Sequence, residues 1–561
     1  MHRWRSGDCH YRRKPAGLGP NELAYPLQAE HEPEKARLLN DTSEFQLTPL
    51  THNDYDFSVK PAASLRNLAL VALLGGFIPD ERLLYPQKGS GLQVADLGGG
   101  PGFLANSLAF SYPNAHFHTV DHNPELSQSA ESLKESFGHT NVSVHHGSIA
   151  SFNAANNGPW DVAMSIDTYG QMVEEDRPSV WDTFENVKDG GLALFTYNCG
   201  VFNAQFEPFR EFLKLFATTQ GKQPIEQTRS ALHLMHELVG EEAGYFSQML
   251  IADRHKRSSK AGARKVFQEF MNIEWDSFYA HQIMPEFLGR EYRMCGDAAH
   301  LNNAKAQAVP RSMVERLNRY PNRIISETLY DFSVNRSHRT DLYIKNREKQ
   351  SHADIVAFWA DAKIMLRPKR ENVKMQLKFR LNENLRLNPA KFDPVLNALA
   401  AGPMKLGDLR KHFPDGPEGD TEMIDVVRVG HALGYLNLYH GEDLFDDPDQ
   451  AVLDYDRGLT GWLEQTKAPA HHLFIPNFGE FRAVQPALYA LAVCARDGGD
   501  NNLEDRAAAL LQDILKAQTE AGLVGGDGAI DNALERIQNF RSRFEQGLRP
   551  VLTRGGYFRA W

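Results

Sequence analysis

Cysteine is scarce in this sequence, and the few cysteines that occur form no recognisable site. No C-x-x-C pair is present among the 561 residues, and the four cysteines lie far apart. This distribution excludes a disulfide-rich secreted scaffold and a structural zinc motif. We therefore expect a reducing, cytoplasmic environment. The cysteines are Cys9, Cys199, Cys295 and Cys494.

Long apolar runs are also missing. The longest one extends from Leu68 to Ile78 and is interrupted by Gly75 and Gly76, whereas a membrane-spanning helix needs about 20 apolar residues. The basic N-terminus is not followed by the apolar segment of a secretory signal. The sequence therefore predicts that a membrane is not a partner of this chain.

An excess of positive charge is absent as well. The chain has 61 lysines and arginines against 72 aspartates and glutamates, a net charge of −11. An acidic chain is a poor general binder of phosphate-rich surfaces, so we expect no nucleic-acid partner. The basic run at 256–265 is interpreted as a solvated helix, because that is the usual setting of such runs.

Between residues 93 and 196, short apolar strands alternate with amphipathic helices. Such alternation predicts an open, mostly parallel sheet with helices on its faces, a Rossmann-like α/β fold. Predicted strands span 93–97, 116–120, 142–145, 161–166 and 192–196, and predicted helices span 103–110, 126–137 and 178–187.

A glycine-rich loop follows the first of these strands. It begins at Asp96 and places glycines at Gly98, Gly100 and Gly102, in a G-x-G-x-G spacing. Glycines at this position allow a tight turn and a close approach of the backbone to a ligand. A dinucleotide-binding loop would have its third glycine where Phe103 stands, so the spacing favours a ligand without a pyrophosphate.

The loop resembles motif I of class I S-adenosylmethionine methyltransferases, and this cofactor is the one that the resemblance implies. Asp121 ends the second strand, where a carboxylate can accept hydrogen bonds from both ribose hydroxyls. By the resemblance, Asp96 faces the amino acid end of the cofactor and Ser148 lies where adenine is read. The candidate cofactor-binding residues are Asp96, Gly98, Gly100, Gly102, Asp121, His122, Ser148, Ile149, Ser165 and Asp167.

Methyl transfer needs few catalytic side chains, because the sulfonium is already activated and the enzyme mainly aligns the acceptor. Open parallel sheets bind substrate at the carboxyl ends of their strands. The catalytic candidates there are Tyr169, after the fourth strand, and Tyr197 and Asn198, at the end of the fifth. For each tyrosine, the alternative is a packing residue with a satisfied hydroxyl.

A metal site is not expected. His116 and His118 share a strand face, and His122 follows shortly after. No further carboxylate or cysteine accompanies them except Asp121, which is assigned to the ribose, so the usual set of four ligands is incomplete.

A wider resemblance covers residues 50–345. The aromatic segment Phe270-Met271-Asn272 and the closing D-F-x-x-N-R-x-x-R motif from Asp331 to Arg339 resemble bacterial methyltransferases with a methyltransferase regulatory domain. That group includes protein lysine methyltransferases of outer-membrane proteins. The chain departs from the Y-S-W-V segment of the family, because it has Tyr169-Gly170-Gln171-Met172 there.

The sequence after the regulatory domain predicts further parts that are mainly helical. Helix, short helix, helix and strand follow one another between 390 and 440 in the manner of a small winged helix. Acidic residues crowd its last helix, which favours a structural or protein-contact role over DNA binding. The predicted domains are a leader (1–45), a class I methyltransferase domain with a mostly parallel seven-stranded sheet (46–204), a mainly α regulatory domain (205–348), a winged-helix-like region (349–445) and a C-terminal helical region (446–561).

The predicted function is methyl transfer from S-adenosylmethionine to an amine, with a protein lysine as first choice of acceptor. Two alternatives stay open: a small-molecule N- or O-methyltransferase, and a non-catalytic regulatory protein that binds S-adenosylmethionine. The sequence does not select among acceptors, because alignment rather than a distinctive residue carries the chemistry. It does not indicate an oligomeric state either.

Overall fold

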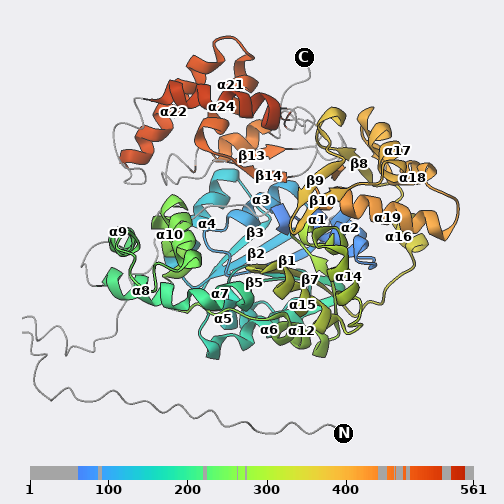
Figure 1. Cartoon of the computed structure of the whole chain (residues 1–561), viewed down its shortest axis with the longest axis horizontal. Coiled ribbons are helices and arrows are strands. Elements are labelled where there is room, and N and C mark those ends of the chain that lie inside the picture. The colour runs from blue at the N-terminus through green and yellow to red at the C-terminus, as the bar shows by residue number, and fades with distance from the viewer. Residues whose placement is uncertain are drawn as a thin grey trace, which may run out of the picture. The chain divides into compact units, whose positions relative to one another are not determined.

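The structure is a computed structural model (Figure 1), in which Leu47–Trp561 form one compact unit. The predicted leader, residues 1–45, lies outside the described residues. The structure describes residues 61–85, 91–218, 224–261, 263–271, 274–439, 452–459, 462, 472–475, 480–520, 532–549, 552 and 557.

A seven-stranded sheet forms the centre of the fold, with the strand order β3-β2-β1-β4-β5-β7-β6 (Figure 1). The first five strands pair in parallel, and β7 runs antiparallel to both β5 and β6. The prediction of a mostly parallel seven-stranded α/β sheet is thus confirmed. The strands are β1 (Gln93–Leu97), β2 (His116–Asp121), β3 (Val142–His146), β4 (Trp160–Ser165), β5 (Val187–Asn198), β6 (Tyr292–Asp297) and β7 (His338–Lys345).

The last two strands come from the part of the chain that the sequence assigned to a mainly α regulatory domain. β7 pairs with β5 along seven residues, from Leu192 opposite Ile344 to Asn198 opposite His338. The sheet therefore extends beyond the predicted boundary at residue 204, while the boundaries of the domains themselves stay predictions. The pairing also brings the start of β7 to the edge where β5 ends.

Helices cover both faces of the sheet. One face packs against α1 (Leu65–Leu74) and α3 (Phe103–Ser111), and the other against α6 (Pro178–Glu185) and α12 (Ala280–Gly289). Local sequence sets their ends: Ser64 caps α1 by accepting a hydrogen bond from the Asn67 N–H. Further helices of this part are α2 (Glu81–Leu84), α4 (Pro124–Phe137), α5 (Ile149–Ala155), α7 (Gly200–Asn203), α13 (Lys305–Ala308), α14 (Arg311–Leu317) and α15 (Arg323–Val334).

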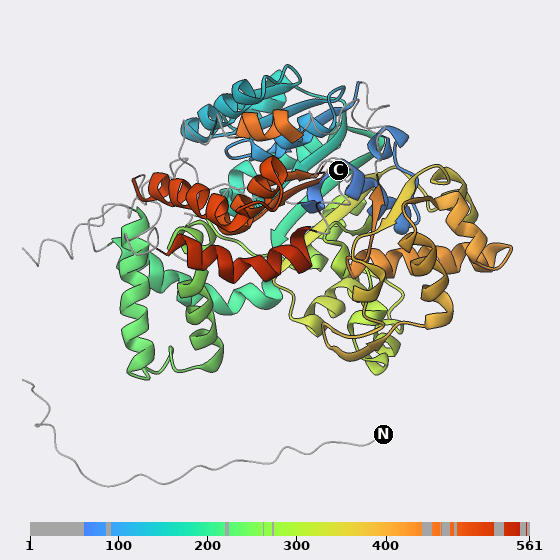
Figure 2. The same ribbon diagram turned by 90° about the horizontal axis from the view of Figure 1, so that it is seen from above.

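A helical insertion lies between β5 and β6. It consists of α8 (Glu207–Thr218), α9 (Pro224–Gly240), α10 (Met249–Ala261) and α11 (Ala263–Phe270), which stand together as the green helices of Figure 2. These helices bury a core of their own, with Phe209, Leu213, Met235 and Phe267 among its members. The insertion is therefore held together by aromatic and aliphatic side chains of its own helices.

The next segment packs against α1. Its three-stranded sheet has the order β11-β8-β12, and His431 and Arg428 hydrogen-bond to Asn67 and to the Leu74 carbonyl of α1. The predicted succession of helix, short helix, helix and strand is present. The elements are α16 (His352–Phe358), β8 (Lys363–Leu366), β9 (Gln376–Phe379), β10 (Asn382–Arg386), α17 (Pro389–Ala400), β11 (Met404–Lys405), α18 (Leu406–Leu409), α19 (Pro417–Ala432) and β12 (Leu436–Tyr439).

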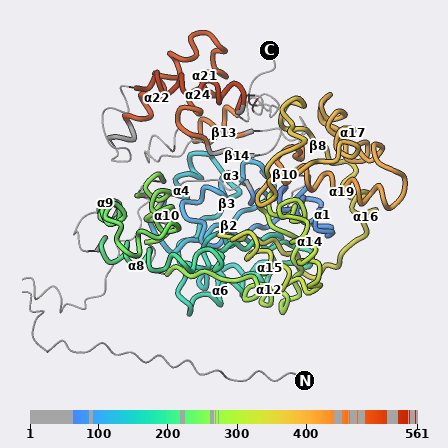
Figure 3. The backbone as a smooth tube through the Cα atoms, in the orientation of Figure 1, coloured from blue at the N-terminus to red at the C-terminus, as the bar shows by residue number. Residues whose placement is uncertain are grey.

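The C-terminal part is mostly helical and packs on the first helices of the sheet (Figure 3). Its core includes Phe103 of α3 and Leu133 of α4. The Phe103 ring meets Trp462 edge-on, with 5.8 Å between ring centroids. The described elements are β13 (His472–Ile475), β14 (Glu480–Ala483), α21 (Pro486–Gly498), α22 (Leu503–Glu520) and α24 (Ala533–Arg543).

Candidate active site

The glycine loop has the backbone conformation that its spacing predicts. The φ angles of Gly98, Gly100 and Gly102 are +69°, +56° and +69°, in the left-handed region that only glycine adopts at little cost. The N–H groups of Gly98 and Gly99 both donate to the Val120 carbonyl of β2, at 2.9 and 3.0 Å. The loop is therefore fixed between the ends of β1 and β2, and Gly102 leads directly into α3.

The loop is also closely packed, so that a side chain has no room on it. A Cβ atom on Gly98 would collide with the Thr168 side chain, and one on Gly102 with Ala130 of α4. The Thr168 hydroxyl donates to the Leu97 carbonyl at 2.9 Å. The segment that follows β4 is thus held against the glycine loop. A ligand that contacts both segments needs them to be close together.

Asp121 connects the loop to the end of β2. Its Oδ2 accepts a hydrogen bond from the Gly100 N–H and its Oδ1 one from the Asn123 N–H, both at 2.9 Å. Each carboxylate oxygen can accept more than one hydrogen bond, so ribose hydroxyls can still be bound here. The neighbouring His122 is 88% exposed, with its Nδ1 3.8 Å from Asp121 Oδ1, and borders the same position.

Two buried polar groups stand next to the loop. Asp96 is nearly inaccessible to solvent, and Ser165 at the end of β4 is fully buried. Among the described residues, the Ser165 hydroxyl has no hydrogen-bond partner. Its residue pairs in register with Leu97, directly before the glycine loop. A buried hydroxyl left unsatisfied at this point fits a site that a polar ligand completes.

The residues after β3 are engaged in starting a helix. Ser148 is the N-cap of α5 and accepts a hydrogen bond from the Ser151 N–H at 3.1 Å. Ile149, the first residue of α5, is mostly buried. The Ser148 hydroxyl can still donate its proton, so the assignment of this pair to adenine stays a prediction.

Asp167 stands at the carboxyl end of β4 with a φ of +57°. Thr196 of β5 holds it in place: the Asp167 N–H donates to Thr196 Oγ1 at 2.7 Å, and that hydroxyl donates to Asp167 Oδ1 at 2.8 Å. The same carboxylate oxygen lies 3.2 Å from Nε2 of His338, the first residue of β7. Sequence reasoning missed His338, because only the pairing of β7 with β5 brings it here.

Tyr169 forms an aromatic corner beside Asp167. Its hydroxyl accepts a hydrogen bond from Trp181 Nε1 at 3.2 Å, and its ring meets that of Phe278 with centroids 5.2 Å apart. The guanidinium of Arg177 lies over both rings, 5.4 and 5.3 Å from their centroids. Asn198 is next to this corner, since its carbonyl accepts the Phe278 N–H at 2.8 Å.

Tyr197 borders this corner with its ring, which lies edge-on to that of Phe278 with 6.3 Å between the centroids. Its side chain is buried, and its hydroxyl donates to Asp341 Oδ2 at 3.2 Å. Burial raises the pKa of Tyr197 well above its usual value, and the Asp341 carboxylate adds to this effect. The geometry therefore matches the packing alternative, a tyrosine with a satisfied hydroxyl, and a catalytic role for Tyr197 stays a prediction.

The charged residues of the D-F-x-x-N-R-x-x-R motif build a buried ionic network. Arg339 donates through Nη1 to both carboxylate oxygens of Asp331 at 2.7 Å, and through Nε to both of Asp341 at 2.9 Å. Its Nη2 reaches Glu327 at 3.2 Å, and Arg336 bonds Asp331 at 3.1 Å. The network joins α15 to β7, so this part of the motif supports the sheet.

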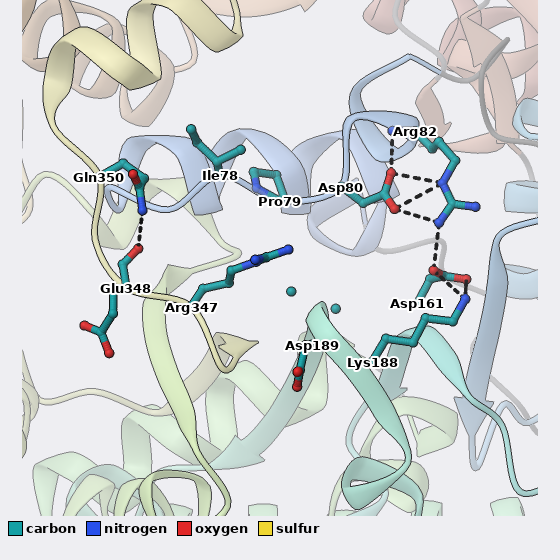
Figure 4. Close-up of a pocket in the computed structure, with 12 residues that line it drawn as sticks. Ile78, Pro79, Asp80, Arg82, Asp161, Lys188, Asp189, Arg347, Glu348 and Gln350 are labelled. Atoms are coloured by element: carbon teal, nitrogen blue, oxygen red, sulfur yellow. Dashed lines mark hydrogen bonds and ion pairs between the residues drawn. The ribbon is translucent and has the colours of Figure 1, made fainter.

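A cavity of about 380 Å³ lies at the opposite edge of the sheet, where β4 and β5 begin (Figure 4). Asp161 at its wall is bound by Lys188 at 2.8 Å and by Arg82 at 3.0 Å. Since the glycine loop stands at the other ends of the strands, this cavity is separate from the candidate site.

Neither a metal cluster nor a membrane helix accompanies the site within the described ranges. The part of the chain that the structure describes contains no group of three or more histidine, cysteine, aspartate or glutamate side chains placed to hold a metal ion. In that same part, no helix is both long and apolar enough to span a bilayer.

Comparisons with known proteins identify two families, one that matches the segment with the glycine loop and one that matches the segment with β6 and β7. Residues 88–240 match the family described as "Methyltransferase domain", and residues 263–345 the family described as "Predicted methyltransferase regulatory domain". An uncharacterized protein of Synechocystis sp., sll1526, is 22% identical over 357 residues, which are 63% of this chain and 70% of that protein.

Two solved structures share the fold over most of the chain. PKMT2 from Rickettsia typhi has a TM-score of 0.57, and its complex with AdoHcy has a TM-score of 0.59. Each is 15% identical and covers 88% of this chain and 99% of its own. The chain is thus an S-adenosylmethionine-dependent methyltransferase, in which a methyltransferase domain is followed by a regulatory domain.

Proposed function

We propose that the chain transfers the methyl group of S-adenosylmethionine to an amine, and that this amine is a protein lysine. The observation that carries the proposal is the arrangement at one sheet edge. The left-handed glycine loop with Asp121 stands beside an acidic and aromatic corner formed by Asp167, Tyr169 and Phe278. The resemblance to bacterial protein lysine methyltransferases and the fold shared with PKMT2 support the choice of acceptor.

The cofactor supplies an activated methyl group on a sulfonium when it is bound. Asp121 binds the ribose hydroxyls, the glycine loop lets the backbone approach the ligand, and Asp96 with Ser165 provides the buried polar contacts. Ser148 and Ile149 border the adenine. The position of each residue along the edge of the sheet supports this division of roles.

The acceptor lies on the side of β4 and β5. The rings of Tyr169 and Phe278 offer an apolar wall for the methylene chain of a lysine, and Asp167 offers a carboxylate to its amine. Asn198 is the neighbouring residue at the end of β5, bound to Phe278 through its backbone carbonyl. Because transfer requires the amine in line with the methyl carbon, holding it in this corner supplies most of the catalysis.

We assign a protein-contact role to the winged-helix-like segment. Three of the four carboxylates of α19 are paired within the segment: Glu422 lies 3.4 Å from Lys391, Asp420 bonds Arg410, and Asp425 bonds Arg428. An acidic last helix repels phosphate. A polypeptide substrate is the partner that such a surface suits better than DNA.

Label transfer from methyl-labelled S-adenosylmethionine tests the acceptor class. The purified protein is incubated with a bacterial lysate, the proteins are precipitated, and label is counted in pellet and supernatant. We expect label in the pellet, and its loss in Asp121→Ala, because that change removes the ribose acceptor. Glu125→Gln, at an exposed carboxylate on the first turn of α4, is the control and should keep full activity.

The remaining outcomes identify the alternatives. Label confined to small molecules would replace the protein lysine by a small-molecule N- or O-acceptor. Calorimetric binding of S-adenosylmethionine without any transfer would favour the regulatory, non-catalytic protein. Unchanged affinity in Asp121→Ala would refute the assignment of the ribose.

A further inference from the structure

One pair of side chains at the acceptor corner has the geometry of an acid–base device. Nε2 of His338 lies 3.2 Å from Oδ1 of Asp167, and both side chains are partly exposed, at 36% and 40%. The same carboxylate oxygen accepts a hydrogen bond from the buried hydroxyl of Thr196, which holds the carboxylate in place. A histidine oriented by a held carboxylate and open to solvent is the usual form of a general base.

We propose that His338 is the catalytic base that removes a proton from the acceptor amine, and that Asp167 is its positioning residue. This inference rests on the proposed function and adds to it the group that makes the amine nucleophilic. A lysine ammonium holds its proton up to a pKa of about 10.4, and only the neutral amine has a lone pair for attack. A base beside the amine therefore increases the reactive fraction at neutral pH.

The position of the pair relative to the glycine loop follows from a chain of contacts. Thr168, the neighbour of Asp167, donates to the Leu97 carbonyl and packs on Gly98. His338 stands opposite Asn198 in the β5–β7 register. The pair therefore lies between the loop and the aromatic corner, where the acceptor nitrogen must reach the methyl group.

The proton and electron pairs balance as follows. With Nε2–H donated to Asp167, the Nδ1 lone pair of the neutral imidazole takes one proton from the ammonium. The freed amine lone pair forms the new N–C bond, and the S–C bond breaks with its electrons going to sulfur, which becomes a neutral thioether. The imidazolium, stabilised by Asp167, then releases the proton to solvent.

Asp167, Asn198 and Arg336 are neighbours of His338 on the elements around it. From β4 the charge is Asp167, and from β5 the opposite residue is the neutral Asn198. Within its own segment, Arg336 donates through Nε to the backbone carbonyl of His338 at 3.1 Å, while another of its nitrogens bonds Asp331. The carboxylate of Asp167 contacts the ring at Nε2, and it favours the protonated form that the mechanism needs after transfer.

The kinetic test compares His338→Gln with the wild type and with His412→Gln, a change at an exposed histidine on the 3-10 turn Arg410–His412. Using label transfer to lysate proteins, we expect kcat to fall about 10²- to 10⁴-fold in His338→Gln, as for loss of a general base. The affinity for S-adenosylmethionine, measured by calorimetry, should not change. His412→Gln should behave as the wild type.

The pH profile separates a base from a merely structural residue. Wild-type kcat should rise with pH as His338 becomes neutral, and Asp167→Asn should move this limb to lower pH, because the charge that favours imidazolium is lost. In His338→Gln the limb should vanish. A His338→Gln enzyme that retains kcat within twofold of the wild type, or retains the limb, would overturn the proposal.

The tautomer of His338 can be measured without a methyl acceptor, so this test does not depend on the proposed function. Long-range ¹H–¹⁵N spectra of histidine-labelled protein, with the His338 signal assigned by its loss in His338→Gln, report the ring tautomer. The Nε2–H form, sensitive to Asp167→Asn, supports the pair, whereas an Nδ1–H form refutes it. If the wild type methylates neither proteins nor small molecules, the proposed function fails, and this spectrum still decides the pair.

Discussion

Single residues at the glycine loop show how backbone conformation and space act together. Gly98 and Gly138 share a left-handed φ, +69° and +67°, but their surroundings differ. A Cβ on Gly98 would strike the Thr168 side chain, whereas one on Gly138, the C-cap of α4, would meet open space. A side chain at either position would therefore strain the backbone, but only at Gly98 would it also collide with a neighbouring side chain.

From this pair we predict different effects of alanine. Gly138→Ala should lower stability by about 1–2 kcal/mol, the cost of a left-handed alanine, and leave S-adenosylmethionine affinity unchanged. Gly98→Ala carries the same strain but also displaces Thr168, so we expect affinity to fall at least about tenfold. Calorimetric titration and urea unfolding of both variants measure these effects, and equal affinities in the two would contradict this view of the loop.

The site residues that the sequence predicted are those whose position depends on a neighbouring strand or helix in the sequence. Asp96, the three glycines and Asp121 lie at or directly after the ends of strands that the pattern predicts, and the structure brings the loop and Asp121 together. His338 reaches the site only because β7 pairs antiparallel with β5, a contact between segments far apart in the chain. For Tyr197, the sequence could not tell that its hydroxyl is engaged by Asp341 of β7, because that contact also depends on the pairing of β7 with β5.

At the scale of elements, α15 and β7 are joined by charge rather than by apolar packing alone. Glu327 of α15 is 4% exposed and lies within reach of Lys305, Arg323 and Arg339. Burial acts to raise the pKa of Glu327, but these cations outweigh it and hold the pKa at about 2. Asp331 in the same network shows the reverse, since burial raises its pKa to about 6.

This network predicts a pH dependence with a definite sign. A carboxylate whose pKa is lowered on folding contributes stability above its unfolded pKa, about 4.3, and that stability is lost as the pH falls toward 2. Glu327→Gln should therefore be less stable than the wild type at pH 7, and the difference should shrink between pH 4.5 and 3. Thermal unfolding across this range, with the exposed Glu315→Gln as control, tests it, and a constant difference would contradict the assignment.

Among the elements, β1 to β5 could be predicted because each strand is followed by its own glycine, acid or helix signal. β5 is longer than the predicted strand 192–196, since it begins at Val187 and continues through Gly190 and Gly191. β6 was missed: its pairing with β7, rather than a strong local pattern, determines it. Strands that complete a sheet from a distant segment carry little local information.

At the scale of the whole molecule, two parts of the chain outside the parallel strands contact elements that carry the candidate site. Through Trp462 the C-terminal part braces α3, the helix that starts at the glycine loop. The helical insertion between β5 and β6 has a separate core. Its two ends meet beside the acceptor corner, because Phe278 donates to the Asn198 carbonyl and accepts from the Gly200 N–H.

Because the residues that flank the insertion lie next to each other, the insertion can be replaced by a short linker. We predict that its removal affects methyl transfer to proteins but not cofactor binding. Replacing residues 204–275 by a short glycine–serine linker should preserve the sheet, since Asn203 keeps its bonds to the Cys199 and Ser337 carbonyls and the insertion core leaves as a unit. S-adenosylmethionine binding should persist, because the glycine loop and Asp121 are not part of the insertion. Label transfer to proteins should fall at least about tenfold, or 1.4 kcal/mol in transition-state stabilisation.

The reason for that fall is that the insertion continues directly into Phe278 and borders the corner where a polypeptide must enter. Cooperative urea unfolding and calorimetric cofactor affinity verify that the shortened protein is folded and competent to bind. If it binds the cofactor and still methylates lysate proteins at the wild-type rate, the insertion has no part in acceptor recognition. If transfer shifts from proteins to small amines, the insertion restricts the corner to the side chain of a large substrate, and the regulatory region acts through access to the site.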